Sequence, residues 1–273
     1  MMPPSKPLRP IVKSYFYFKC SKEEAEEALS YVPPFNFEGL RFNLGTCPDI
    51  YINGSHEKEP RYLIIPPLTR SFTMGFGGTV STLVVLFDRV VTAKLFRTSL
   101  SHLTDKMTDL FDVVPQLTRR LDDQFKNAVS LEEVRNAVNQ FLEAFLCDHT
   151  FSENMVDYAI RRMYQSGGQL GIGKIVDELG TTYKTLGKKY REQVGILPKT
   201  FSRIIRVNYA LNALNDLPTY RAADLYTQLG YYDEAHLIKD FKQVLGITPK
   251  KLYSPGGNEQ WYNFDEYRAM LIE

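Results

Sequence analysis

Residues 229–253 read LGYYDEAHLIKDFKQVLGITPKKLY, and the pattern in this stretch decides the fold that we expect. Leu237, Phe241 and Leu245 recur every fourth residue, the spacing of one face of an α-helix. Asp233 is a residue type that caps helix N-termini through its side chain. The stretch therefore predicts a helix over residues 233–245 that packs inward through its three apolar residues.

A diverged copy of this pattern lies upstream. Leu179-Gly180 and Leu229-Gly230 each end a short amphipathic stretch, Ile172–Leu179 and Ala222–Leu229. The residue pairs that follow at a separation of 51 are Leu186 with Leu237, Tyr190 with Phe241, Gly195 with Gly246, and Pro198-Lys199 with Pro249-Lys250. Helix, Gly-containing turn and second helix make up the helix-turn-helix plan, in which glycine permits the tight reversal. The segment predicts two such units.

The second helix of each unit is the candidate recognition helix. In the first unit Thr182 is the expected N-cap, and Leu186, Tyr190 and Val194 form the inward face. Between the units, residues 199–216 form a periodic helix that would hold both at a fixed separation; its inward set is Phe201, Ile204, Ile205, Asn208, Leu211 and Leu214. The N-terminal part of a recognition helix enters the major groove. The candidate DNA-binding residues are therefore Thr182, Tyr183, Lys184, Gly187, Lys188 and Arg191, and then Asp233, Glu234, Ala235, His236, Lys239 and Lys242.

Positive charge gathers in the same segment. Residues 152–253 hold 15 Lys and Arg against 10 Asp and Glu, a net +5, whereas residues 1–151 carry −1. A positive surface is what binding to phosphates requires, although +5 is modest. Charge alone is equally consistent with an ordinary solvated surface.

From about Val156 to Tyr253 the chain resembles the AraC/XylS family of bacterial transcription regulators. The stretches that carry the resemblance are 172–180 (IGKIVDELG), 194–201 (VGILPKTF), 206–214 (RVNYALNAL) and 229–253. The resemblance implies a double helix-turn-helix domain that binds double-stranded DNA, and an N-terminal half that senses a small molecule or forms a homodimer. It also implies a cytoplasmic activator or repressor acting with RNA polymerase.

Departures from the family pattern lie in the second unit. Leu237 replaces a usual aromatic residue, and Lys239 replaces a usual Arg, which removes the bidentate fork. Glu234 and Asp240 would place negative charge near the DNA backbone, although Glu234 could instead accept a hydrogen bond from a cytosine amino group. These residues support the alternative function, a ligand-sensing or protein-interaction module with weakened DNA binding.

The N-terminal segment predicts an antiparallel barrel or sandwich. The expected strands are Ile11–Phe18, Arg41–Leu44, Asp49–Ile52, Tyr62–Ile65, Arg70–Phe76 and Leu83–Phe87. Asn53-Gly54 suits a hairpin turn, and Ser21–Ser30 suits a short acidic helix. We assign its aromatic residues to the core, with a ligand pocket as the alternative; they include Tyr15, Tyr17, Phe35, Phe42, Tyr51, Tyr62, Phe72 and Phe76. Arg41, Arg61 and Arg70 are expected at the surface, or else anchoring an acidic ligand.

After Ala93 the pattern becomes helical, with Leu131, Val134 and Val138 at helical spacing and a capping box at Ser130 and Glu133. The fold class we expect is α+β. Its parts are a β-rich regulatory domain (1–100), a helical bridge with a candidate dimer surface (101–151), the double helix-turn-helix domain (152–253) and an acidic aromatic tail (254–273).

Other classes of protein are disfavoured. We find neither a signal peptide nor a bilayer-length apolar run, and Cys20, Cys47 and Cys147 form no disulfide pattern. The four histidines are scattered, so we expect no metal site. Residues 75–78 (GFGG) lack the ending of a phosphate-binding loop. We therefore expect no cofactor and no enzyme activity.

Overall fold

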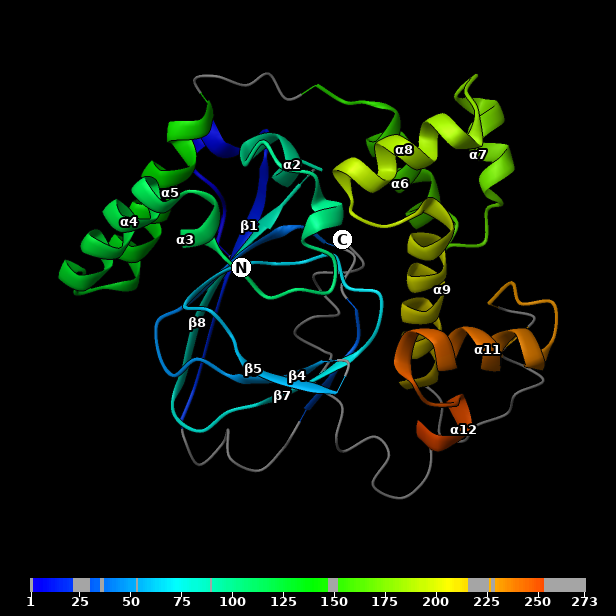
Figure 1. The fold of residues 1–273 in the computed structure, drawn as a ribbon, viewed down its shortest axis with the longest axis horizontal. Coiled ribbons are helices and arrows are strands. Elements are labelled where there is room, and N and C mark those ends of the chain that lie inside the picture. The colour runs from blue at the N-terminus through cyan, green and yellow to red at the C-terminus, as the bar shows by residue number, and fades with distance from the viewer. Residues whose placement is uncertain are drawn as a thin grey trace.

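Two antiparallel sheets form the N-terminal half of the chain (Figure 1). The computed structural model describes residues 2–21, 30–34, 37–52, 54–88, 90–146, 152–215, 226 and 229–252. The five-stranded sheet has the order β1 (Val12–Cys20), β8 (Val80–Phe87), β3 (Gly39–Asn43), β6 (Tyr62–Ile64), β9 (Thr108–Asp109). The four-stranded sheet has the order β2 (Ser30–Val32), β7 (Phe72–Gly75), β4 (Asp49–Ile52), β5 (Ser55–Lys58). The antiparallel β-rich N-terminal part that we predicted within an α+β fold class is confirmed.

All six predicted strands are present, with ends shifted by a few residues. The hairpin expected at residues 53–54 joins β4 to β5, with Ile52 opposite Ser55 and Gly54 at φ +79°. Three short strands, β2, β5 and β9, were not predicted. The residues of β5, Ser-His-Glu-Lys, are all exposed and polar, so the strand carries no apolar alternation to reveal it. The helix predicted over Ser21–Ser30 falls mostly outside the described residues, and Ser30 begins β2.

The interior strand β8 is buried on both faces because each face of the sheet meets a different layer. Leu83 and Val85 join a core cluster shared with helices, whereas Val84 and Leu86 belong to a separate cluster on the other side. The residues of the four-stranded sheet that face inward are Val32, Ile50, Ile52, Phe72 and Met74. The strand domain is thus a sandwich with a helical cover.

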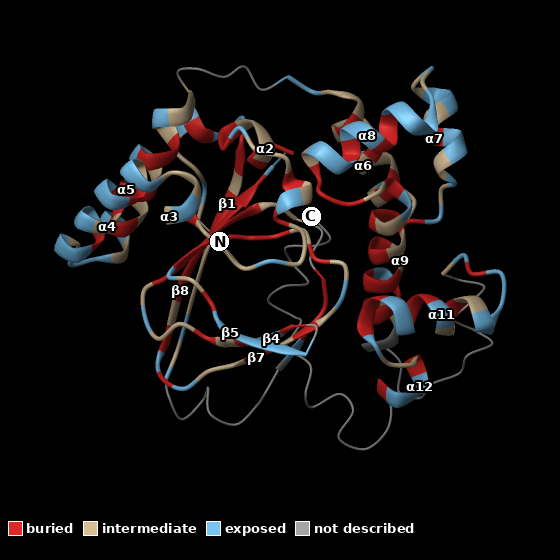
Figure 2. Cartoon of the chain, in the orientation of Figure 1, coloured by how far each residue is buried: buried red, intermediate tan, exposed pale blue. Residues whose placement is uncertain are grey.

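The helical cover is formed by α3 (Leu110–Val113), α4 (Pro115–Asn127) and α5 (Leu131–Leu146). The buried residues of α4 and α5 join the same cluster as Leu40, Phe42 and Val85. Tyr62 Oη donates to Asp122 Oδ1 of α4 at 2.6 Å. In Figure 2 both helices carry buried residues on one side and exposed residues on the other. The segment expected to form a bridge is therefore packed on the five-stranded sheet.

A short helix, α2 (Thr92–Leu95), links the sheet to the C-terminal part, and Glu38 caps it. Glu38 Oε2 accepts from the backbone N–H groups of Val91 at 3.1 Å and Thr92 at 2.9 Å. Burial raises the pKa of this carboxyl from 4.5 to about 7; the two N–H donors oppose the rise, and the nearby Asp157 charge adds to it. Between these two pH values the folded chain keeps a proton that the unfolded chain releases. The free energy of unfolding therefore falls as pH rises through this range.

Replacing Glu38 with Gln should raise the melting temperature at pH 8 and leave it unchanged near pH 4.5. Gln keeps an acceptor oxygen without the buried charge, and each kcal/mol gained corresponds to about 2–4 °C. Thermal unfolding across pH tests this, with Glu57→Gln, an exposed carboxylate on β5, as the control. A Glu38→Gln variant that melts at or below the wild-type temperature at pH 8 would contradict the inference that the ionised Glu38 carboxylate destabilises the fold.

No helix in the described part of the chain has the length and apolarity that spanning a membrane requires.

Candidate nucleic-acid interface

Six described helices form the C-terminal part of the chain (Figure 1). They are α6 (Met155–Gln165), α7 (Ile172–Glu178), α8 (Tyr183–Gln193), α9 (Pro198–Asn215), α11 (Glu234–Leu245) and α12 (Pro249–Leu252). Their buried residues form one continuous apolar cluster. The predicted first helix of the second unit, Ala222–Leu229, lies largely outside the described residues. The first unit is α7–α8, and α11 is the second helix of the second unit.

Helix α8 begins and packs as predicted. Thr182 is its N-cap, and Thr182 Oγ1 accepts from the Thr185 N–H at 3.1 Å. Leu186, Tyr190 and Val194 are buried, and Tyr190 packs edge-on against Phe201 of α9, with ring centroids 5.6 Å apart. The helix is therefore fixed along one face, which directs its opposite face toward solvent.

The outward face of α8 carries Tyr183, Lys184, Lys188 and Arg191, all exposed. One residue predicted on this face is not there, since Gly187 is buried. A Cβ at Gly187 would lie 3.9 Å from Leu197, so this side of the helix lies close to the chain that follows α8. The inward stripe is thus wider than the four-residue spacing suggested, because a residue next to Leu186 also turns inward.

Helix α11 repeats this arrangement. Asp233 is its N-cap, and Asp233 Oδ1 accepts from the His236 N–H at 2.7 Å. Leu237, Phe241 and Leu245 are buried, as predicted. The candidate DNA-binding residues Asp233, Glu234, Ala235, Lys239 and Lys242 are exposed, and His236 is half-buried. Within the described residues, both recognition helices therefore present their N-terminal turns to solvent.

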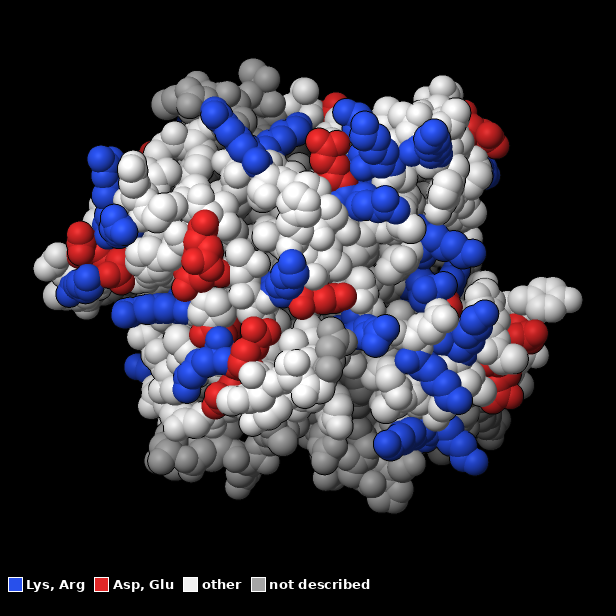
Figure 3. Space-filling model, in the orientation of Figure 1, with Lys and Arg blue, Asp and Glu red and all other residues white. Residues whose placement is uncertain are grey.

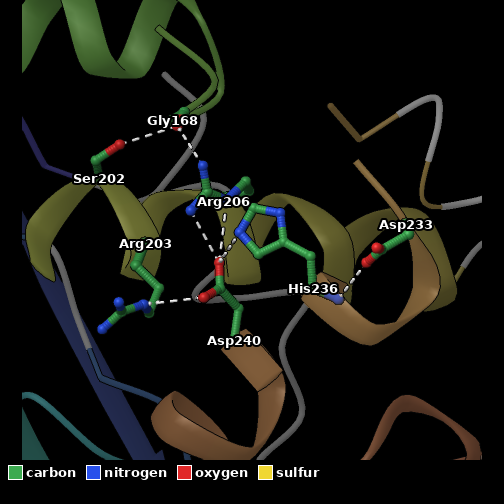
Figure 4. Close-up of polar contacts among 7 residues, drawn as sticks. All are labelled: Gly168, Ser202, Arg203, Arg206, Asp233, His236 and Asp240. Carbon is green, nitrogen blue, oxygen red and sulfur yellow. Dashed lines mark hydrogen bonds and ion pairs between the residues drawn. The ribbon is translucent and has the colours of Figure 1, made fainter. Parts of the chain in front are cut away.

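We expected Asp240 to place a negative charge near the DNA backbone, and the structure contradicts this expectation. Its side chain is 3% exposed, and it lies between two arginines of α9 (Figure 4). Asp240 Oδ1 accepts from Arg203 Nε at 2.9 Å, and Oδ2 accepts from Arg206 Nη2 at 2.8 Å. The pairing was hidden from the sequence because the partners lie 34 and 37 residues away on another helix.

Alanine at either N-cap should cost about 1 kcal/mol of stability, because one helix donor loses its side-chain acceptor. Thr182→Ala tests the first unit and Asp233→Ala the second, by chemical denaturation. Thr182→Ser and Asp233→Asn retain a capping oxygen and should remain within about 0.5 kcal/mol of wild type. An alanine variant as stable as its capping counterpart would show that the cap contributes nothing.

The opposite ends of both helices contact the N-terminal half of the chain. After α8, Thr104 Oγ1 donates to Gly195 O at 2.9 Å. At the end of α11, Ser71 N and Ser71 Oγ donate to Val244 O and Leu245 O at 2.8 and 2.9 Å. These contact residues were not predicted, since single polar residues in loops give no sequence signal. The arrangement leaves the N-terminal turns free while the C-terminal ends are held.

Lysine and arginine side chains gather over the C-terminal helices in the space-filling view (Figure 3). The exposed basic residues of α8, α11 and α12 are Lys184, Lys188, Lys189, Arg191, Lys239, Lys242, Lys250 and Lys251. Glu234 and Glu192 are exposed acidic residues on the same helices. The exposed charge on these helices is thus mainly basic, whereas the first turn of α11 carries Glu234 and its N-cap Asp233.

A small pocket lies between the two sheets of the N-terminal half. Its lining includes Arg41, Glu59, Leu68, Phe72 and Met107. Its volume of about 20 Å³ is enough for one or two water molecules. Of the aromatic residues assigned to the core, Tyr15, Phe42, Tyr62 and Phe72 are buried, Tyr17 and Phe76 are half-buried, Tyr51 is exposed, and Phe35 lies outside the described residues.

Arg41 is buried, so the expectation of surface exposure is wrong for this residue. Arg41 Nη1 donates to Glu59 Oε2 at 3.3 Å, and Asn43 Nδ2 donates to Glu59 Oε1 at 2.9 Å. Burial raises the pKa of Glu59, and the Arg41 charge opposes this rise. A buried ion pair needs such additional hydrogen bonds to offset desolvation. In the described part of the chain, no His, Cys, Asp and Glu side chains cluster as a metal site would require.

Comparison with known proteins gives one family and several structures. A family model described as a helix-turn-helix domain matches residues 175–253. No curated protein matches the chain. ToxT from Vibrio cholerae is 10% identical, with a TM-score of 0.45 over 86% of this chain and 96% of that chain. Wild-type ToxT of strain SCE256 with a bound unsaturated fatty acid is 12% identical, with a TM-score of 0.42 over 87% and 94%.

The AraC-like transcriptional activator CuxR is 14% identical, with a TM-score of 0.25 over 74% of each chain. The family match covers α8, α9 and α11, the helices that present the capped N-terminal turns. It coincides with the repeated pattern and with the stretches that resemble AraC/XylS regulators. The chain therefore carries a helix-turn-helix domain over residues 175–253.

Proposed function

We propose that the protein is a sequence-specific transcription regulator that places α8 and α11 in successive major grooves of DNA. The observation that carries the proposal is the matched exposure of two capped helix N-termini whose other ends are held by the body of the protein. Grooves on one face of a duplex recur about every 34 Å. One chain with two recognition helices can therefore read two adjacent half-sites.

The exposed side chains divide into two roles. Tyr183 and Lys184 on α8, with Glu234 and Ala235 on α11, occupy the first helical positions and would contact base edges. The remaining cations, Lys188, Arg191, Lys239 and Lys242, would contact phosphates and fix the register. Asp240 is paired with arginines inside the domain, so the exposed acidic residues at the start of α11 are the N-cap Asp233 and Glu234. Of these, Glu234 could accept from a cytosine amino group.

Control by the N-terminal half is the second part of the proposal. The inter-sheet pocket is lined by Pro66, Leu68 and Phe72, and Ser71 of the same segment bonds the end of α11. A small molecule that widened this pocket would therefore shift the segment that holds α11. The division into regulatory domain, helical bridge and DNA-binding domain, the homodimer and the contact with RNA polymerase remain predictions.

Binding of the purified protein to labelled fragments of its own upstream DNA, across a salt series, tests the function. We expect selective binding whose logarithm falls linearly with the logarithm of salt concentration, since each phosphate contact releases counterions. Equal, weak binding to all fragments, with and without candidate small molecules, would instead favour a sensing or protein-interaction module.

A further inference from the structure

The turn after α6 lies directly against the linker helix α9. Gly168 has φ +75°, and a Cβ there would lie 2.4 Å from Ser202 O and 2.9 Å from Arg206 N. Ser202 Oγ also donates to Gly168 O at 2.9 Å. The backbone at the start of the first unit is therefore seated on α9 without space for a side chain.

The same turn contacts the second unit. A Cβ at Gly230 would lie 2.5–2.6 Å from three side-chain atoms of Gln169. Gly230 precedes α11 and has φ +69°, which a glycine adopts without strain. Residues 168 and 169 thus contact the linker helix and the turn of the second unit together.

Arg206 connects these contacts to α11 (Figure 4). Its Nη1 donates to Gly168 O at 3.2 Å, while its Nη2 and Nε donate to Asp240 Oδ2 at 2.8 and 3.2 Å. The guanidinium also lies over the ring of Tyr231, 5.2 Å from its centroid. One side chain on α9 therefore binds both the turn that leads into the first unit and the second recognition helix.

We propose that Asp240 is a positioning residue that, through Arg206, fixes the second recognition helix relative to the first and so sets the half-site spacing that the protein accepts. This inference rests on the proposed DNA-binding function. Asp240 itself is buried and faces α9, so it touches no DNA. Its role is to hold Lys239 and Lys242 of the same helix in register with α8.

The geometry also indicates that the pair can be broken without unfolding the domain. The apolar face of α11, Leu237, Phe241 and Leu245, is buried in the domain core, and we expect it to stay packed when Asp240 is changed. Arg203 and Arg206 are 25% and 17% exposed, so water can solvate both after the carboxylate is removed. Asp240→Asn should therefore loosen the orientation of α11 while leaving the helix formed.

The experiment uses the full chain and duplexes that the wild-type protein selects from a random-sequence pool. Derivatives of the selected duplex carry one base pair inserted or removed between the half-sites, which rotates one half-site by about 34° relative to the other. We expect this change to weaken wild-type binding at least about tenfold, which is 1.4 kcal/mol. The Asp240→Asn variant should bind the original duplex less tightly than the wild type does. Its affinity should fall less than about threefold further when the spacing is altered.

Glu178→Gln is the matched control. Glu178 of α7 forms a bidentate pair with Arg162 of α6, at 2.7 and 2.8 Å, so this pair joins α6 to the first unit and does not link the first unit to α11. Removing the Glu178 carboxylate should leave the loss of affinity on the altered spacings as large as in the wild type. Arg206→Gln is the second variant, because it keeps the Arg203–Asp240 pair and removes the link to Gly168; it should relax spacing as Asp240→Asn does.

A full tenfold penalty in folded Asp240→Asn or Arg206→Gln would overturn the positioning role while leaving DNA binding intact. If Asp240→Asn does not fold, the result for Arg206→Gln decides. A wild-type protein that enriches no sequence from the pool would overturn the proposed function itself, and the positioning role with it.

Discussion

Replacing Lys184, Lys188 and Arg191 together with Gln should weaken DNA binding about 100-fold at physiological salt. All three side chains are exposed on the outward face of α8. Lys188 and Arg191 are assigned to phosphates, and each phosphate contact contributes about 0.9 to the slope of log affinity against log salt, so the slope should become shallower by about 2. Fluorescence anisotropy across a salt series measures both quantities. The fold should be unaffected, because none of the three contributes to the buried face.

The control removes the same charge elsewhere. Lys58 on β5, with Arg119 and Arg120 on α4, are exposed basic residues of the N-terminal half. Their joint replacement with Gln should change affinity by less than about threefold and leave the slope unchanged, since charges more than a Debye length from the duplex are screened. Similar losses in both triple variants would show that net charge, and not contact through α8, governs binding.

Local chemistry explains which features of the site were predictable. Thr182 and Asp233 cap their helices through bonds to residues three positions on, and the inward faces follow from four-residue spacing. Both are properties of a single helix, and both are confirmed. Gly187 is the exception: spacing locates the centre of a buried stripe, but its width depends on how closely the neighbouring chain approaches.

Features that depend on tertiary packing could not be predicted in this way. Asp240 reads as an exposed acid on a recognition helix until α9 is placed beside it. Arg41 likewise reads as a surface residue on a strand until Glu59, 18 positions away, is placed against it. In α5 the periodicity identified the apolar face but not its partner, which is the five-stranded sheet. Which polar residues pair, and which element covers an apolar face, depend on residues that are distant in sequence and meet only in the tertiary structure.

Replacing Gly195 with Ala should destabilise the contact between the two halves of the chain by about 2–5 kcal/mol. Gly195 ends the first recognition helix at φ +86°, where an L-residue costs about 1–2 kcal/mol. A Cβ there would also lie 2.5 Å from Pro67 Cγ and 2.8 Å from both Leu100 O and Thr104 Oγ1. Two of these atoms belong to the backbone or to a proline ring and cannot rotate away. The clash is therefore relieved only if the N-terminal and C-terminal halves of the chain move apart. Overpacking of this kind costs about 1–3 kcal/mol.

The internal duplication supplies the control, since Gly246 is the counterpart of Gly195 at the end of the second recognition helix. It has φ +74°, but nothing lies within 4 Å of the position of its Cβ. Gly246→Ala should therefore cost only the backbone strain of about 1–2 kcal/mol. Hydrogen exchange at residues 100–105 should rise in Gly195→Ala and stay at the wild-type rate in Gly246→Ala. Equal stability losses and equal exchange in the two variants would mean that the end of α8 is not held by the N-terminal half in solution, because backbone strain is common to both positions and the steric contact is not.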